Sequence, residues 1–350
     1  MHIQARRVFR LSLTTALALA GAYALQMPLP YLAPLFAWML TATPAPPMGS
    51  KGLLGLILVV LITLGVGLLL TPLLVHYPAS AVLIVALGLY FSFFLTVHRG
   101  KALVGALLTV GFTLISTAGT VSPALAVVVI QALVLGIGLA IFCHWLVYPW
   151  FPEDSAPAQT KPPPPAPDVD QSNWIALRAT LIVLPAYLLA LTNPSMYLPI
   201  IMKSVSLGQQ SSLVSARSAG RELLGSTFLA GCFAVLFWTL LGVATSLWMF
   251  FWLMLLFAVY FSSKLYRLIP SRLPGTFWLN VATTMLILLG PAVEDSATGK
   301  DVYTAFAVRM GLFVAVTLYA WLAVYVLEFL RTRRRSRFAP SLQNTESSSC

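Results

Sequence analysis

Long apolar stretches separated by short polar connections make up most of the chain. In the first half they lie near residues 8–27, 29–45, 52–75, 79–97, 102–118 and 122–147. In the second half they lie near residues 173–192, 195–207, 222–242, 245–262, 276–291 and 302–329. A helix needs about 20 apolar residues to cross the hydrocarbon core of a bilayer. The pattern therefore predicts an all-α, polytopic integral membrane protein with about 12 transmembrane helices.

Two of these stretches are short and contain proline, so each could instead turn back within the membrane. One holds Pro30 and Pro34, and the other holds Pro199 with Lys203 near its end. If all twelve stretches cross and the N-terminus is cytoplasmic, 19 of the 21 Lys and Arg residues face the cytoplasm. Cytoplasmic loops carry the excess of Lys and Arg in membrane proteins. The charges therefore favour twelve crossings, with both termini cytoplasmic.

The composition excludes a soluble globular protein. Hydrophobic residues make up 59% of the chain and charged residues only 9%, whereas soluble domains are roughly 25% charged. The net charge of +11 comes from basic residues scattered between apolar stretches, so it indicates membrane topology and lipid contact rather than a nucleic-acid partner. The basic segment 331–337 is expected to anchor the tail to anionic lipid. Three cysteines without metal-ligand spacing predict no disulfide and no zinc site.

One polar segment divides the chain into two halves. Residues 149–172 contain four consecutive prolines, which cannot form a helix and favour an extended tether. We therefore expect a first membrane unit at 1–148, a cytoplasmic linker at 149–172, a second membrane unit at 173–330 and a basic cytoplasmic tail at 331–350.

The two halves share short sequence features in the same order. The pairs are Arg10 and Arg178, Tyr31-Leu32 and Tyr197-Leu198, Lys51 to Gly55 and Arg221 to Gly225, Tyr90 to Ser92 and Tyr260 to Ser262, and Trp145 and Trp321. Each half has an even number of stretches, so both halves start on the same side of the membrane. The sequence thus predicts two parallel six-helix repeats, related by an axis along the membrane normal.

No enzymatic constellation accompanies this pattern. The chain has no HExxH, no GxSxG, no P-loop lysine motif and no Gly-rich nucleotide loop. We expect no enzymatic activity, no catalytic residues, no metal and no cofactor, and hence no ATP hydrolysis by the chain itself.

The paired proline-containing stretches are the first candidates for a transport pathway. Interrupted helices at matching positions of two repeats are the best sequence pointer to a transporter site, because proline frees a backbone carbonyl. The candidates here are Tyr31, Pro34, Tyr197, Pro199 and Asn193. The alternative is that these are kinked packing helices with tyrosines at the interface.

Cations near the ends of the stretches are the second group of candidates. Lys203 and Arg221, with Lys51 as the counterpart of Arg221, are expected near the cytoplasmic side, where they could gather an anion. The alternative is that they only anchor helix ends by reaching to the lipid headgroups.

Polar residues inside the later stretches complete the candidate pathway. Arg309 lies within the last stretch on the outer side, where it could pair with Asp301 or Glu294 or contact a departing anion. Asn280 and Thr284, with Thr283 between them, lie on one helical face and could line the pathway. Each hydroxyl alone is more commonly structural, because it bonds its own helix.

The start of the chain resembles the fusaric acid resistance and aromatic acid exporter family. An alanine-rich first helix with a basic start precedes Pro30-Tyr31-Leu32-Ala33-Pro34, which resembles the proline-tyrosine element of that family's second helix. The family's third helix begins with an Arg-x-x-Gly element. The stretches from Arg221 to Gly225 and from Lys51 to Gly55 resemble it with one extra residue. The large soluble cytoplasmic domain of longer members is absent.

The resemblance implies an inner-membrane permease that exports aromatic carboxylic acids or similar small organic anions. It also implies coupling to the proton gradient and a periplasmic, HlyD-like membrane-fusion partner. A homo-oligomer is compatible with it. A major-facilitator transporter is the first alternative, but residues 42–51 lack the charged loop motif of that class. A non-transporting membrane scaffold is the second alternative and remains open.

Overall fold

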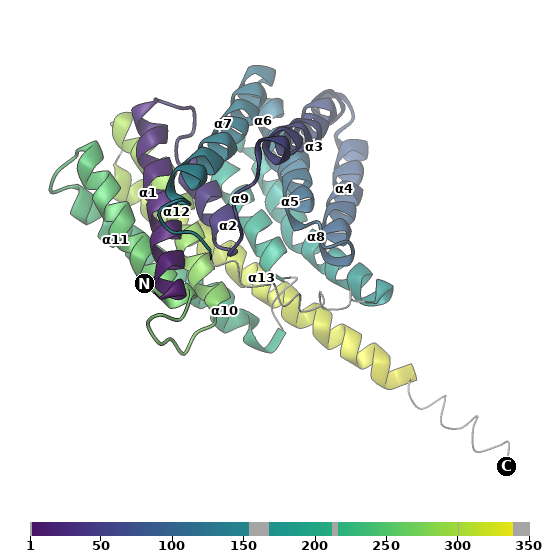
Figure 1. Ribbon diagram of the computed structural model, residues 1–350. Coiled ribbons are helices and arrows are strands. Elements are labelled where there is room, and N and C mark those ends of the chain that lie inside the picture. The colour runs from purple at the N-terminus through teal and green to yellow at the C-terminus, as the bar shows by residue number, and fades with distance from the viewer. Residues whose placement is uncertain (1, 154–167, 212–215, 300, 339–350) are drawn as a thin grey trace, which may run out of the picture.

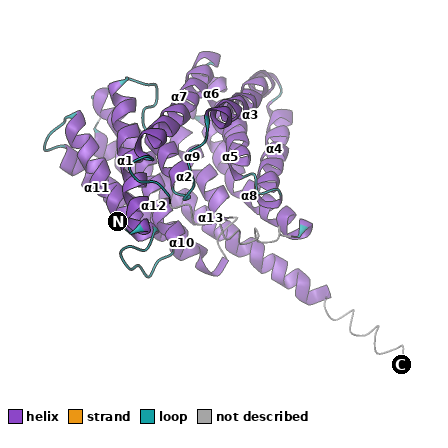
Figure 2. Cartoon of the chain, in the orientation of Figure 1, coloured by secondary structure: helices purple, strands orange, loops and turns teal. Residues whose placement is uncertain are grey.

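The computed structural model describes residues 2–153, 168–211, 216–299 and 301–338, and the regular elements within them are all helices (Figure 2). The first half contains α1 (Ile3–Ala24), α2 (Leu32–Thr41), α3 (Ser50–His76), α4 (Pro78–His98), α5 (Ala102–Val110), the π-helical turn η1 (Gly111–Ile115), α6 (Ser116–Val121) and α7 (Pro123–Val147). The second contains α8 (Val169–Thr192), α9 (Pro194–Ser211), α10 (Ala216–Leu241), α11 (Leu247–Leu265), α12 (Gly275–Ala297) and α13 (Val302–Phe338). The all-α prediction is confirmed for the described residues.

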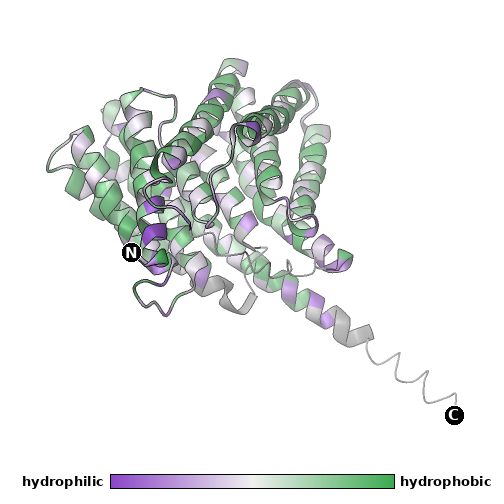
Figure 3. Ribbon diagram, viewed as in Figure 1, coloured by the Kyte–Doolittle hydropathy of each residue, from purple (hydrophilic) through white to green (hydrophobic). Residues whose placement is uncertain are grey.

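Nine of the described helices are long and apolar enough to cross a membrane. They are α3, α4, the continuous run of α5, η1 and α6, α7, α8, α10, α11, α12 and α13. Hydrophobic residues dominate these helices, and hydrophilic ones gather near the start of α1 (Figure 3). The described chain therefore has the make-up of a multi-pass membrane protein.

The other three expected crossings form helices but do not meet that criterion. Helix α1 has 22 residues, but Arg6, Arg7 and Arg10 lower its hydropathy. Helix α2 has only 10 residues, which span about 15 Å at 1.5 Å per residue. Helix α9 has 18 residues and contains Lys203. Twelve crossings are therefore not established by helix length and apolarity.

Proline does not break the two short helices. Pro34 lies in the first turn of α2, where a backbone N–H has no partner within the helix in any case. Pro199 lies further inside α9 and removes one backbone donor, but the helix continues to Ser211. Both proline-containing stretches therefore form continuous helices.

The helices of each half pack together, and several helix pairs join the halves, the two most extensive being α1 with α11 and α4 with α8. Helices α1, α2 and α7 contact one another, as do α8, α9 and α13. Between the halves, α1 packs along α11 and α4 packs along α8 (Figure 1). One hydrophobic core runs from Leu11 on α1 to Phe313 on α13. The two halves are thus one packed unit rather than two separate bundles.

Helix α12 is the most enclosed of the nine apolar helices. Of its apolar stretch 83% is buried, against 22% to 61% in the other eight. It contacts α2, α9, α10, α11 and α13. A polar side chain on α12 therefore faces protein rather than lipid, which makes this helix the natural place to look for a site.

The ends of the two expected membrane units differ slightly from the predicted boundaries. Helix α8 begins at Val169, inside the range expected for the linker, and residues 154–167 of that linker lie outside the described residues. Helix α13 runs on to Phe338 and so includes the start of the expected tail (Figure 1). Residues 339–350 lie outside the described part.

Candidate anion site between helices α9 and α12

Lys203 is the central feature of the site. Its side chain is fully buried, with 0% exposure, and its Nζ donates a hydrogen bond of 2.8 Å to Oγ1 of Thr284 on α12. Within the described part of the chain, no carboxylate forms an ion pair with it. A buried cation in a membrane protein costs about 2.5–3.5 kcal/mol on insertion scales. A hydroxyl offsets only part of that cost, because it carries no negative charge.

The position of Lys203 differs from the predicted one. It was expected near the cytoplasmic end of its stretch, but α9 continues for eight more residues to Ser211. Lys203 therefore lies in the interior of the helix and does not reach to lipid headgroups. The expected end position is wrong because α9 extends through polar residues that hydropathy alone assigns to a loop.

Asn280 lies one helical turn before Thr284 on α12. Its side chain is only 3% exposed, and its Nδ2 has no hydrogen-bond partner among the described residues. Thr283 is also buried. The sequence placed these three residues on one helical face, and the structure adds that Thr284 meets the ammonium of Lys203. The face of α12 that holds Asn280 and Thr284 is thus the one that meets α9.

A second polar contact joins α6 to α8, and both of these helices, like α5 and η1, also pack against α9. Ser116, the residue after the π-helical turn, bonds the carbonyl of Thr113 at 3.2 Å and lies 3.2 Å from the hydroxyl of Tyr187 on α8. Both side chains are fully buried. Isolated π-helical turns are frequent at functional sites. This one belongs to the run of α5, η1 and α6 that packs against α9.

Tyr31 packs against α12 further along the same helix. A side chain added at Gly290 would overlap the aromatic ring of Tyr31, so only glycine fits there. Tyr31 itself is 9% exposed. Tyr197, its counterpart in sequence, is partly buried against the hydrophobic core near the start of α9. The structure thus brings Tyr31 against α12 at Gly290.

Arg309 on α13 lies beside the C-terminal end of α12. Its guanidinium pairs with the carboxylate of Asp295, which is almost fully buried. The predicted partners were Asp301 and Glu294, and both are wrong. Asp301 accepts a hydrogen bond from the backbone N–H of Tyr303 at the start of α13 instead. Arg309 pairs with Asp295 because this carboxylate is on the side of α12 that faces α13. The spacing of residues along the chain does not reveal which side of α12 faces α13.

The remaining candidates lie away from the Lys203 contact or are not described. Lys51 is exposed in the first turn of α3. Arg221 belongs to α10, and its side chain lies outside the described part. Asn193 is exposed at the end of α8. The structure therefore unites only three of the predicted site residues: Lys203, Thr284 and Asn280.

Two ion-pair clusters near the start of α1 and the end of α13 were not predicted. Arg10, only 1% exposed, donates to Oε2 of Glu153 at 2.8 Å, and Nε of Arg7 donates to Oε1 at 2.6 Å. In the second half, Arg178 pairs with Glu328 at 2.8 Å. The matched arginines were visible in the sequence, but their carboxylate partners come from the segment that follows α7 and from within α13.

The charges around Glu153 determine its protonation. Partial burial alone would raise the pKa of this carboxyl. Hydrogen bonds from Arg7 and Arg10, together with their positive charges, outweigh that effect and hold its pKa below the usual value. Glu153 is therefore ionised at neutral pH and forms a fixed ion-pair cluster.

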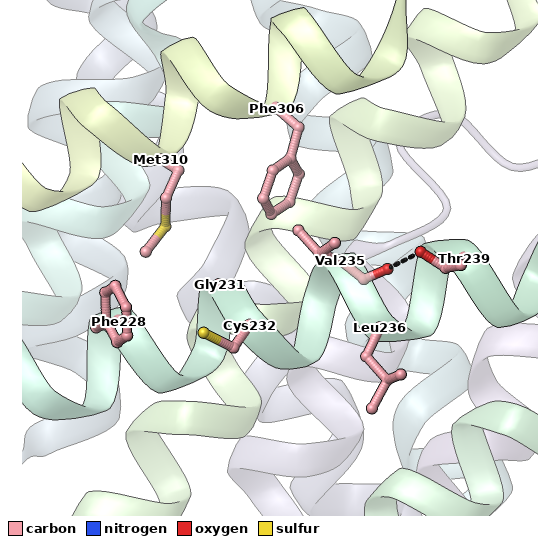
Figure 4. Close-up of a pocket in the computed structure, with 8 residues that line it drawn as sticks. All are labelled: Phe228, Gly231, Cys232, Val235, Leu236, Thr239, Phe306 and Met310. Atoms are coloured by element: carbon pink, nitrogen blue, oxygen red, sulfur yellow. Dashed lines mark hydrogen bonds between the residues drawn. The ribbon is translucent and has the colours of Figure 1, made fainter.

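A groove of about 520 Å³ between α10 and α13 has a different character (Figure 4). It is lined by Phe228, Gly231, Cys232, Val235, Leu236, Thr239, Phe306 and Met310. The hydroxyl of Thr239 is bonded to the carbonyl of Val235 at 2.8 Å. None of the lining residues is charged, so the groove provides no counter-charge for an anion.

Comparison with known proteins gives one match. A protein-family model described as "Protein of unknown function (DUF2955)" matches residues 7–147, which is less than half of the chain and runs from within α1 to the last residue of α7. No curated protein and no solved structure matches the chain.

Proposed function

We propose that this protein is a bacterial inner-membrane efflux permease that exports small organic anions such as aromatic carboxylic acids. Transport would be secondary and proton-coupled, with a periplasmic membrane-fusion protein as partner. The observation that carries the proposal is Lys203, a fully buried cation whose one bonded partner in the described chain is the neutral hydroxyl of Thr284. An anion bound beside it would supply the missing negative charge.

The helix arrangement supports a transporter built from two six-helix repeats. The packing of α1 on α2 and of α2 on α7 is matched by that of α8 on α9 and of α9 on α13. The pairing of α1 with α11 is matched by that of α8 with α4. The pairs Arg10–Glu153 and Arg178–Glu328 occupy corresponding places. The family match also ends with α7, the last helix of the proposed first repeat.

Two further features favour movement of an anion along α12. Lys203 contacts this helix at Thr284, and Arg309 contacts it eleven residues later at Asp295, about 16 Å along a helix axis. Tyr31 lies on Gly290 between these two cations. The arrangement places two basic side chains at different positions along α12, with an aromatic side chain between them. Arg309 is paired with Asp295, whereas Lys203 has no carboxylate partner in the described part of the chain.

Transport by reconstituted protein tests the proposal. Purified full-length protein in liposomes should move 4-hydroxybenzoate under an imposed proton gradient, and Lys203→Met should reduce the rate at least about tenfold, because removing one partner of a buried charge pair costs 2–5 kcal/mol or more. Lys203→Arg keeps the charge and should retain part of the rate.

The matched control is Lys101→Met, the same change at an exposed residue before α5, which should transport at the wild-type rate. Wild-type protein that moves no aromatic acid under any gradient would refute the proposal. Transport by Lys203→Met at the wild-type rate would show that Lys203 is not needed for transport and would leave the proposal without support.

A further inference from the structure

The unpartnered amide of Asn280 indicates what the ammonium of Lys203 binds. Buried amide groups in folded proteins almost always find a hydrogen-bond partner. The Nδ2 of Asn280 has none among the described residues, although the side chain is 3% exposed. An unbonded buried donor costs about 1–3 kcal/mol. A bound hydrogen-bond acceptor would explain why the Nδ2 of Asn280 lies unpaired in the described chain, within the most enclosed of the apolar helices.

Asn280 lies on the same face of α12 as the residue that Lys203 contacts. Residues four apart in a helix lie on the same face, with Cβ atoms about 5–6 Å apart. Asn280 is four residues before Thr284, and Thr284 accepts the hydrogen bond from Lys203. The free amide donors and the ammonium are thus on the same side of α12, where this helix contacts α9.

The donors on this face match the oxygens of one carboxylate. An ammonium has three N–H donors and an Asn amide has two. Thr284 takes one donor of Lys203, so four donors remain: two on the ammonium and two on the amide. A carboxylate can accept from both groups with its two oxygens, and charge-assisted hydrogen bonds of this kind are the strong ones.

We propose that Lys203 and Asn280, with Thr284 orienting the ammonium, form a carboxylate site that selects monoanions. The inference rests on the proposed function and specifies its substrate class. One cation neutralises one negative charge, and no second cation contacts this face in the described part of the chain. A dicarboxylate would bury an unpaired charge, which is costly in a low-dielectric interior.

Thermal unfolding of the purified full-length protein in detergent tests the site without requiring transport. Millimolar benzoate should raise the unfolding temperature, because a ligand that binds only the folded state stabilises it. Benzamide, which has a similar shape and no charge, should not. Isophthalate, which carries a second carboxylate, should bind at least about tenfold more weakly than benzoate, which corresponds to about 1.4 kcal/mol.

Substitutions at Asn280 test whether the stabilisation by benzoate arises from binding at this site. Asn280→Asp places a tethered carboxylate beside Lys203 and should abolish stabilisation by benzoate. Asn280→Ser removes the amide donors with a smaller change and should weaken benzoate binding about tenfold. Thr180→Val is the control, because Thr180 is a buried hydroxyl on α8 that bonds the carbonyl of Ala176 in its own helix. It should bind benzoate like the wild type.

The outcomes separate this inference from the proposed function. Unchanged benzoate binding by Asn280→Asp, equal binding of isophthalate and benzoate, or no stabilisation by benzoate would overturn the carboxylate site. Benzoate binding that is lost in Asn280→Asp, with no transport by the wild type, would support the site and refute export. Transport that persists in Asn280→Asp would refute the site and leave export intact.

Discussion

Arg10 and Lys203 are both almost fully buried cations, but their surroundings differ. The guanidinium of Arg10 bonds the carboxylate of Glu153 at 2.8 Å and the carbonyl of Phe151 at 3.3 Å, and it lies 5.6 Å from the ring centre of Tyr148. The ammonium of Lys203 bonds only the hydroxyl of Thr284 in the described part of the chain. One cation is neutralised within the protein, and the other is not.

The difference separates an internally neutralised cation from the one to which we assign a role in transport. The second half repeats the Arg10 arrangement, since Arg178 bonds Glu328, which also accepts from the indole N–H of Trp174 at 3.2 Å. Such fixed pairs hold helix ends together and leave no charge for a ligand. A buried cation without an internal counter-charge is costly in the empty protein, and under the proposed function an anionic substrate would remove that cost.

The largest expected effect is the contrast in stability between Arg10→Met and Lys203→Met. Arg10→Met should lower the free energy of unfolding by about 2–3 kcal/mol, because it leaves Glu153 with Arg7 alone in a partly buried place. Lys203→Met should leave stability unchanged or raise it, because it removes a cation that no carboxylate in the described chain neutralises. Unfolding of both variants in one detergent measures the contrast, and equal losses would abolish the distinction between the two cations.

A smaller effect is expected at the hydroxyl that Lys203 contacts. Thr284→Val should cost about 1–2 kcal/mol in the wild type, because the buried ammonium loses its bonded acceptor. In the Lys203→Met background the same change should cost close to nothing. The double-mutant cycle isolates the coupling between the two side chains, and additive losses would show that Thr284 acts only in packing.

The smallest effect is the acid sensitivity of the Glu153 cluster. Because the folded-state pKa of Glu153 lies below its usual value, its charge contributes stability above the unfolded-state pKa of about 4.3. That contribution is lost as the pH falls through the folded-state pKa. The difference in unfolding temperature between wild type and Glu153→Gln should therefore be constant near neutral pH and shrink below about pH 4.3. A difference that grows on acidification would contradict this sign.

Much of the helical framework could be predicted because its signal is local. Each expected apolar stretch corresponds to a helix, and α3, α4 and α7 begin and end within two residues of the predicted ranges. The short helices were less predictable. Helix α9 continues through Lys203 to Ser211, because packing against α8, α12 and α13 replaces the hydropathy that the segment lacks.

The sequence alone determined that the chain is apolar, helical and suited to a membrane, because hydropathy and helix length are properties of neighbouring residues. It also identified Lys203, Asn280 and Thr284 as candidate residues of a transport pathway. Only the tertiary structure decided that Lys203 meets Thr284, that Arg309 meets Asp295 and that Arg10 meets Glu153. These partners lie on different helices or in a loop beyond them, and the choice among them depends on which helix faces pack together rather than on spacing along the chain.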